Sequence, residues 1–284
     1  MENILAAVDF SSCSINALEH AVSIAEKGDL NLYMIWVNNP SVTKTTIHSS
    51  SSKELIEEVE KQFKHLIDKY QPVLKNSKID YLIREGKMYK EVIGTASELE
   101  AACIVLGTHG SSGFEQFWIG SNAMKVISLA QCPVITLRAG VAPTVDLKRI
   151  VMPIDSSLET RQKVPFTVYL AEIFDAEIYI LGVYTSRYKS MMRRVDDYVK
   201  QVVKYVESFD VPVHVESMRV DSITTSIIEY AKKVDANLIS IMTEKDSSPF
   251  NMLTGPQAQQ MINHSPYPVL TVNSVELMRT GVRG

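Results

Sequence analysis

The fold is decided by a short apolar stretch that ends in aspartate and occurs twice, as Ile4-Leu5-Ala6-Ala7-Val8-Asp9 and, 146 positions later, as Ile150-Val151-Met152-Pro153-Ile154-Asp155. A second pair of stretches, Pro133-Val134-Ile135-Thr136-Leu137 and Pro268-Val269-Leu270-Thr271-Val272, repeats at an offset of 135. The second copy is therefore 11 residues shorter than the first. A repeat of this length is typical of a duplicated domain and not of a solenoid unit.

Within each copy, short apolar runs alternate with amphipathic stretches. The apolar runs predict buried strands at 3–9, 31–37, 79–84, 102–107 and 133–138, and at 149–155, 177–184, 211–218, 237–242 and 268–273. The stretch after the first strand predicts a helix with Ser11 or Ser12 as its cap and Gly28 as its stop. Strands that alternate with helices predict an α/β fold, with parallel strands and helices on both faces of the sheet.

We expect one domain over residues 1–140 and another over 147–276, joined near Ala139-Gly140-Val141-Ala142-Pro143. The 284-residue length suits two domains. A net charge of −4 gives no sequence-wide basic field, so neither nucleic acid nor a membrane surface is an expected partner.

The expected location is the cytoplasm. The N-terminus lacks a basic leader segment, and no apolar run is long enough to span a bilayer. Three cysteines are too few for a disulfide framework, which favours a reducing compartment.

A glycine-rich segment is the main candidate for chemistry. It reads Leu106-Gly107-Thr108-His109-Gly110-Ser111-Ser112-Gly113 and is followed by Gly120-Ser121-Asn122. Glycines allow close approach of backbone N–H groups, and a helix N-terminus attracts phosphate. The segment lacks the lysine of a P-loop and the position of a dinucleotide fingerprint. On these residues alone, a surface turn remains the alternative.

The spacing of these glycines resembles the nucleotide motif of the universal stress protein family. Gly107, Gly110, Gly120 and Ser121 fit the pattern of glycine, two residues, glycine, nine residues, glycine and serine. The Asp-Phe-Ser that begins at Asp9 and the Cys132-Pro133-Val134 segment also resemble the family. The resemblance covers nearly the whole chain as two tandem copies, and it implies five-stranded parallel sheets of order 3-2-1-4-5.

The resemblance also implies an ATP site, with Mg²⁺ as a further candidate ligand. Ala7 and Asp9 would lie by the adenosine, and Val37 would offer backbone groups to adenine. The ribose and phosphates would contact a larger set: Leu106, Gly107, His109, Gly110, Gly120, Ser121 and Asn122. Asp9 is either a helix cap or a ligand contact. We assign no catalytic residue, and the resemblance implies at most slow ATP hydrolysis.

The second copy departs from the motif. At the offset of 135, Gly107 becomes Met242, Gly110 becomes Lys245, Gly113 becomes Ser248 and Ser121 becomes Pro256, while Gly120 is retained as Gly255. Proline removes an N–H group that could bind phosphate. Pro153 and Asp155 remain at the front of the pocket. We therefore expect the second copy not to bind ATP in the same way.

Two functions stay open, a stress-response or signalling module that binds adenine nucleotide and a scaffold that acts through protein contacts. Arg187, Lys189, Arg193 and Arg194 form a short basic patch that is either solvated surface or a docking site for an acidic protein. No metal-binding motif is present. We expect strands 133–138 and 268–273 to join the copies as a pseudo-dimer. A homodimer of whole chains is a further expectation.

Overall fold

The computed structural model describes residues 2–39, 52–108, 119–141, 146–243 and 255–274. The first half alternates strands and helices as predicted: β1 (Asn3–Ala7), α1 (Ser12–Gly28), β2 (Asn31–Asn38), α3 (Ser52–Tyr70), β3 (Ile79–Glu85), α4 (Met88–Glu98), β4 (Ile104–Gly107), α5 (Ser121–Leu129) and β5 (Val134–Leu137). The predicted first strand ends two residues early, because the chain turns at Phe10, whose φ is 64°.

The second half repeats this order with one addition. Its elements are β6 (Arg149–Ile154), the 3₁₀ turn η1 (Glu159–Arg161), α6 (Val164–Phe174), β7 (Glu177–Tyr184), α7 (Lys189–Glu207), β8 (Val213–Arg219), α8 (Ile223–Lys233), β9 (Leu238–Thr243), α9 (Pro256–His264) and β10 (Val269–Asn273). Three of the four basic-patch residues, Lys189, Arg193 and Arg194, lie in the first turns of α7.

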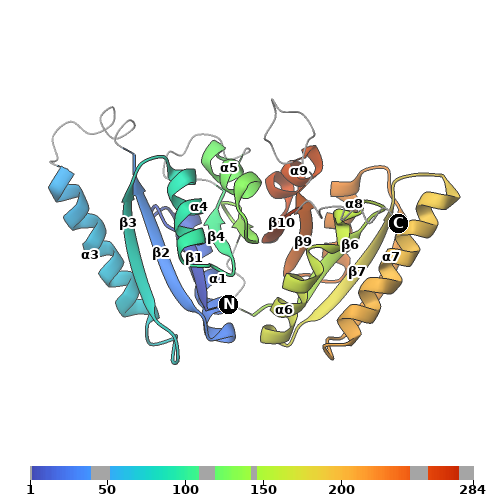
Figure 1. Ribbon diagram of the computed structural model, residues 1–284, viewed down its shortest axis with the longest axis horizontal. Helices are drawn as coiled ribbons and strands as arrows, with labels where there is room; N and C mark the ends of the chain where they lie inside the picture. Colours follow the sequence, from blue (N-terminus) through green and yellow to red (C-terminus); the bar gives the residue numbers. More distant parts are fainter. Residues whose placement is uncertain (1, 40–51, 109–118, 142–145, 244–254, 275–284) are drawn as a thin grey trace, which may run out of the picture.

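The described strands form one ten-stranded sheet in the order β3-β2-β1-β4-β5-β10-β9-β6-β7-β8. Each half is parallel and has the predicted 3-2-1-4-5 order, so the predicted fold class is confirmed. The longest helices, α3 and α7, lie at opposite outer ends, while α5 and α9 lie near the centre (Figure 1).

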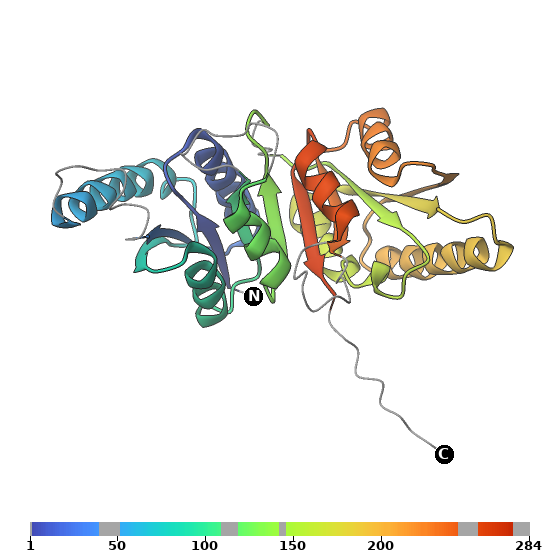
Figure 2. The same ribbon diagram turned by 90° about the horizontal axis from the view of Figure 1, so that it is seen from above.

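The two halves meet through β5 and β10, which run antiparallel and lie side by side in both ribbon views (Figure 2). Two buried threonines at equivalent positions bond across this seam. Thr136 Oγ1 donates to the carbonyl of Val269 at 3.3 Å, and Thr271 Oγ1 donates to that of Val134 at 3.0 Å. The reciprocal contacts confirm the predicted pseudo-dimer, in which each apolar strand covers the other.

Helices cover both faces of the sheet, and the core on the face of α1 and α6 is continuous between the halves. Gly28 is the last residue of α1, as predicted, and it also serves this packing. A Cβ at Gly28 would lie 2.8 Å from the Tyr169 hydroxyl of α6. The left-handed residue that ends α1 is Asp29, whose φ is 49° and whose N–H bonds to Ala25.

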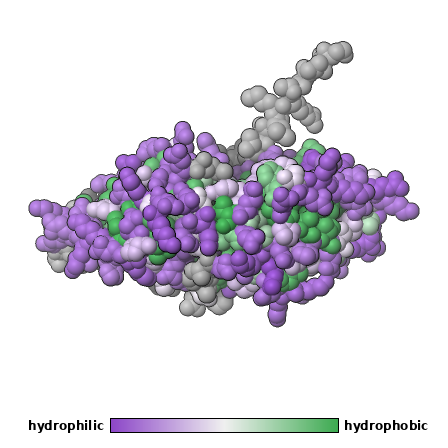
Figure 3. Space-filling view, turned by 90° about the horizontal axis from the view of Figure 1, so that it is seen from below, coloured by the Kyte–Doolittle hydropathy of each residue, from purple (hydrophilic) through white to green (hydrophobic). Residues whose placement is uncertain are grey.

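Hydrophilic residues cover most of the lower face of the molecule (Figure 3). None of the helices in the described part of the chain combines the length and the apolar character needed to cross a bilayer.

Candidate functional site

A cavity of about 310 Å³ lies at the carboxyl ends of β1, β2 and β4. This edge is where open parallel sheets bind ligands. Its walls include every predicted site residue that the structure describes, namely Ala7, Asp9, Val37, Leu106, Gly107, Gly120, Ser121 and Asn122. His109 and Gly110 lie outside the described residues. Residues from three strands and one helix, far apart in sequence, are thus brought around one space.

Sequence reasoning missed several apolar walls of this cavity. Ile35 and Trp36 lie near the end of β2, and Met88 and Val92 lie on α4. Val92 is a buried apolar residue of α4, and an apolar helix pattern does not distinguish core packing from a ligand wall. The added residues give the cavity an apolar side opposite its polar loop residues.

Asp9 organises the start of α1 without itself capping the helix. Its Oδ1 accepts bonds from the N–H and the hydroxyl of Ser11, at 3.1 and 2.6 Å. Ser11 is the cap residue, because its Oγ accepts a bond from Ser14 N at 3.2 Å. The Asp9 carboxylate, held by these bonds, also lines the cavity.

Packing by itself requires a glycine at position 107. A Cβ at this position would lie 2.8 Å from Cys13 Sγ and 3.0 Å from the Cys13 carbonyl carbon. Glycine therefore lets the end of β4 approach the first turn of α1. This reason differs from the expected one, which was close approach of the Gly107 backbone to phosphate.

The start of α5 supplies donors for an anion. Its cap residue is Gly120, which provides no side-chain cap. The first-turn N–H groups of the helix therefore point out of α5 without the side-chain acceptor that α1 receives from Ser11. Gly120 N donates to the Thr108 carbonyl at 2.9 Å, and a Cβ at Gly120 would lie 3.3 Å from that oxygen. These features fit a phosphate group, which would gain N–H donors, the Ser121 hydroxyl and the helix dipole.

The second half contacts this loop directly. Asn263 of α9 is buried, and its Oδ1 accepts a bond of 2.8 Å from Ile119 N, next to Gly120. The Asn263 carbonyl accepts a bond of 2.8 Å from Arg138 Nη1 at the end of β5. No sequence motif indicates this contact, because 144 positions separate Ile119 and Asn263.

The equivalent edge of the second half carries a cavity of about 380 Å³. Pro153 and Asp155 line it as predicted, and Met242 occupies the wall where the first half has Gly107. Lys245 and Ser248 lie outside the described residues. Pro256 begins α9, so this helix lacks one of the N–H donors that α5 offers.

Metal binding would need a cluster of suitable side chains. Among the residues that the structure describes, no three His, Cys, Asp or Glu side chains lie together in a way that could hold a metal ion.

Known proteins match each half of the chain. Residues 1–138 and 146–273 both match the universal stress protein family. A universal stress protein of Methanocaldococcus jannaschii is 30% identical over 144 residues, which are 48% of this chain and 82% of that protein. The universal stress protein YxiE of Bacillus subtilis is 27% identical over 144 residues, 48% of this chain and 97% of that protein.

The two-domain arrangement also has a structural counterpart. The crystal structure of a universal stress protein from Archaeoglobus fulgidus matches with a TM-score of 0.75 and 18% identity, covering 96% of this chain and 97% of that one. At this identity the likeness concerns the fold.

Proposed function

Because this chain belongs to the universal stress protein family, as a member with two domains in tandem, we propose that its first domain binds ATP or a related adenine nucleotide. In this proposal the bound nucleotide makes the protein a stress-response or signalling module. One observation carries it: the α5 N-terminus, which has no side-chain cap, shares a cavity with the fixed carboxylate of Asp9 and with apolar walls.

The two ends of the cavity suit the two ends of a nucleotide. The apolar side chains of Ile35 and Val92 favour a flat base, and Val37 at the end of β2 offers backbone groups to it. Asp9 suits a neutral hydroxyl or amino donor, since its negative charge would repel phosphate. Ser121 and the first-turn N–H groups of α5 would hold the phosphate chain. Mg²⁺ carried by the nucleotide is part of the proposal.

The first test is to identify by mass spectrometry any nucleotide that copurifies with the full chain. Calorimetry with ATP, ADP, cAMP and GTP then measures affinity, with an expected adenine-nucleotide Kd between about 1 mM and 1 µM. We expect one nucleotide per chain, because Met242 and Pro256 alter the second cavity. Ser121→Ala removes one phosphate donor and should weaken binding, whereas Ser128→Ala on the same helix lies outside the cavity and should not.

Absence of any nucleotide binding would favour the second function, a scaffold of the same fold that acts through protein contacts. Slow ATP hydrolysis, a cytoplasmic location and a homodimer of whole chains remain parts of the proposal. They are measured by phosphate release, by fractionation and by light scattering.

A further inference from the structure

We propose that the second domain has a separate ligand site, built around Lys163, for a small carboxylate with an apolar body such as a medium-chain fatty acid. The site is the 380 Å³ cavity at the carboxyl ends of β6, β7 and β9, which is large enough for a small molecule. This inference concerns another domain and another ligand class than the proposed nucleotide site, so neither depends on the other.

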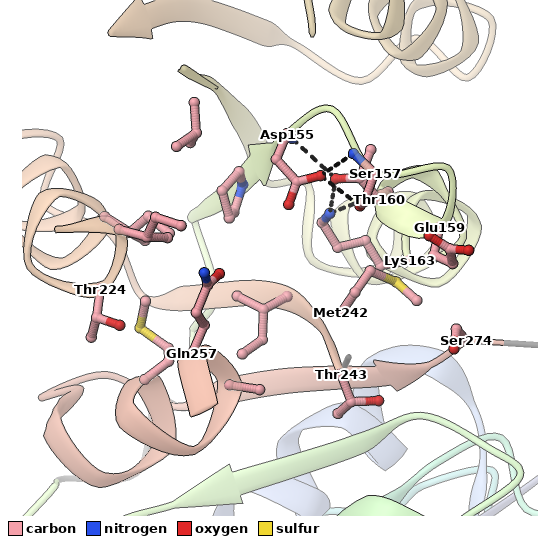
Figure 4. Close-up of a pocket in the computed structure, with 17 residues that line it drawn as sticks. Asp155, Ser157, Glu159, Thr160, Lys163, Thr224, Met242, Thr243, Gln257 and Ser274 are labelled. Atoms are coloured by element: carbon pink, nitrogen blue, oxygen red, sulfur yellow. Dashed lines mark hydrogen bonds between the residues drawn. The ribbon is translucent and has the colours of Figure 1, made fainter. Parts of the chain in front are cut away.

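Most of the cavity wall is apolar. α8 contributes Ile223 and Ile227, α9 contributes Met261, and the strand ends contribute Val183 and Ile241. In Figure 4, Thr224 and Gln257 lie on one side of the cavity and Lys163 and Asp155 on the other. A ligand that fills this space therefore gains mainly from burial of apolar surface.

Lys163 is the unusual feature of the cavity. It is only 2% exposed, although lysine is almost never fully buried without a charged partner. Its ammonium donates to the carbonyl and, at 3.4 Å, to the hydroxyl of Thr160. It forms no ion pair with any carboxylate of the described residues. Two acceptors on one threonine leave an ammonium with three N–H donors short of a partner.

The buried charge is costly in this state. Burial lowers the pKa of Lys163 from 10.5 to about 8, although the attraction of Asp155 acts in the opposite direction. The amine therefore remains mostly protonated at neutral pH. A ligand carboxylate would supply a further acceptor in direct contact with the ammonium, whereas Asp155 forms no ion pair with Lys163. Charged hydrogen bonds of this kind are the stronger ones.

The neighbouring carboxylates restrict the ligand to a single negative charge. Asp155 accepts bonds of 2.7 and 2.5 Å from the N–H and hydroxyl of Ser157, and it faces the same space as Lys163 (Figure 4). Glu159 also lines the cavity. One cation and two anions repel a triphosphate but tolerate one carboxylate placed against Lys163.

The first domain has no lysine at the equivalent position. At the offset of 146, Lys163 corresponds to Ala17, a fully buried residue of α1. The lysine thus belongs to the second domain alone. It lies at the start of α6, where the equivalent helix of the first domain is already in its second turn.

Calorimetry on the full chain with octanoate and octanamide tests the site. The two probes have the same apolar chain, but only octanoate is charged. We expect octanoate to bind once per chain and at least about tenfold more tightly than octanamide, from one charged hydrogen bond. Lys163→Met should remove this preference, because neither probe can then accept a charged hydrogen bond from residue 163. Lys163→Arg should retain it, and Lys232→Met on the exposed surface of α8 serves as the control.

Equal affinity of the wild type for both probes would overturn the proposal, as would full octanoate affinity in a folded Lys163→Met protein. Failure of octanoate to saturate the wild type below about 10 mM would also overturn it. Circular dichroism establishes the fold of each variant, and Lys163→Arg decides the question if the methionine variant does not fold. Saturating ATP should leave octanoate binding unchanged, so this result and the nucleotide result remain separate.

Discussion

The two domains share a turn at the end of their first strands but build different helices after it. Asp9 N donates to Ser14 Oγ at 3.2 Å, and Asp155 N donates to Thr160 Oγ1 at the same distance. In the first domain this turn leads directly into α1 at Ser12. In the second it leads into the 3₁₀ turn η1, and α6 begins only at Val164, six residues later in the aligned numbering.

A single position on the fourth strand accounts for much of this difference. Gly107 leaves room for Cys13, whereas a side chain there would come within 2.8 Å of the cysteine sulfur. Met242 has such a side chain at the equivalent place, so a first turn in the α1 position is excluded. The difference between Gly107 and Met242 thus accompanies a different helix start, and Lys163 lies where α6 begins.

The largest expected effect tests whether the domains are one folding unit. Ile135 and Leu270 pair directly across the β5–β10 seam, and both are fully buried. Changing either to alanine should lower the free energy of unfolding by about 2–5 kcal/mol. Because the seam joins both halves of the core, each variant should shift the same single transition in urea. Val215→Ala on edge strand β8, where the side chain is 50% exposed, is the control.

Two separate transitions, each moved by only one of the variants, would show that the domains unfold independently. The β5–β10 seam would then be an interface between two independently folded domains and not part of a common core.

The seam was predictable from the sequence, whereas the two most informative polar contacts were not. Pro133-Val134-Ile135 and its repeat at Pro268 carry a local apolar pattern, and the glycine spacing located the cavity of the first domain. Lys163 follows Arg161 and Gln162, a polar run that normally indicates exposed surface. Its burial depends on the delayed start of α6. The sequence also gives no sign of the Asn263 contact, because its partner Ile119 belongs to the other domain.

The next effect in size concerns Lys163. Replacement by methionine should raise the free energy of unfolding at pH 7 by about 3 kcal/mol, the cost that corresponds to a pKa lowered from 10.5 to about 8. The folded chain loses the proton near pH 8, whereas the unfolded chain keeps it to about pH 10.5. The stability of the wild type should therefore rise relative to the variant over this interval. Urea unfolding at pH 7 and pH 10 measures both values.

Lys232→Met, on the exposed surface of α8, is the matched control for this measurement. A constant gap between the wild type and Lys163→Met at both pH values would mean that the amine is hydrated in the folded chain. Lys163 and Ala17 would then differ in how their side chains pack and not in the burial of a charge.

A smaller effect concerns a residue of the second domain that should influence ATP binding in the first. Asn263→Ala leaves Ile119 N without its acceptor next to Gly120, which costs about 1–2 kcal/mol and should weaken ATP binding about tenfold. The equivalent residue of the first domain, Ser128, bonds to Met124 of its own helix. Gln260→Ala on α9 is the matched control. Unchanged ATP affinity in Asn263→Ala would show that the contact holds the domains together without positioning the loop.

The smallest effect compares the two serines of the shared turn. Ser11 caps α1, and its hydroxyl also bonds to Asp9, so Ser11→Ala should lower the free energy of unfolding by about 1 kcal/mol. Ser157 makes the same bond to Asp155 but is exposed and caps no helix, because η1 begins after Leu158 without a side-chain cap. Ser157→Ala should therefore cost less than about 0.5 kcal/mol. Urea unfolding of both variants measures the difference, with Ser11→Thr as a variant that keeps the cap. If the two alanine variants lose equal free energies of unfolding, the stabilisation comes from the serine–aspartate bond, which both domains have. It would then not come from the cap of α1, which only the first domain has.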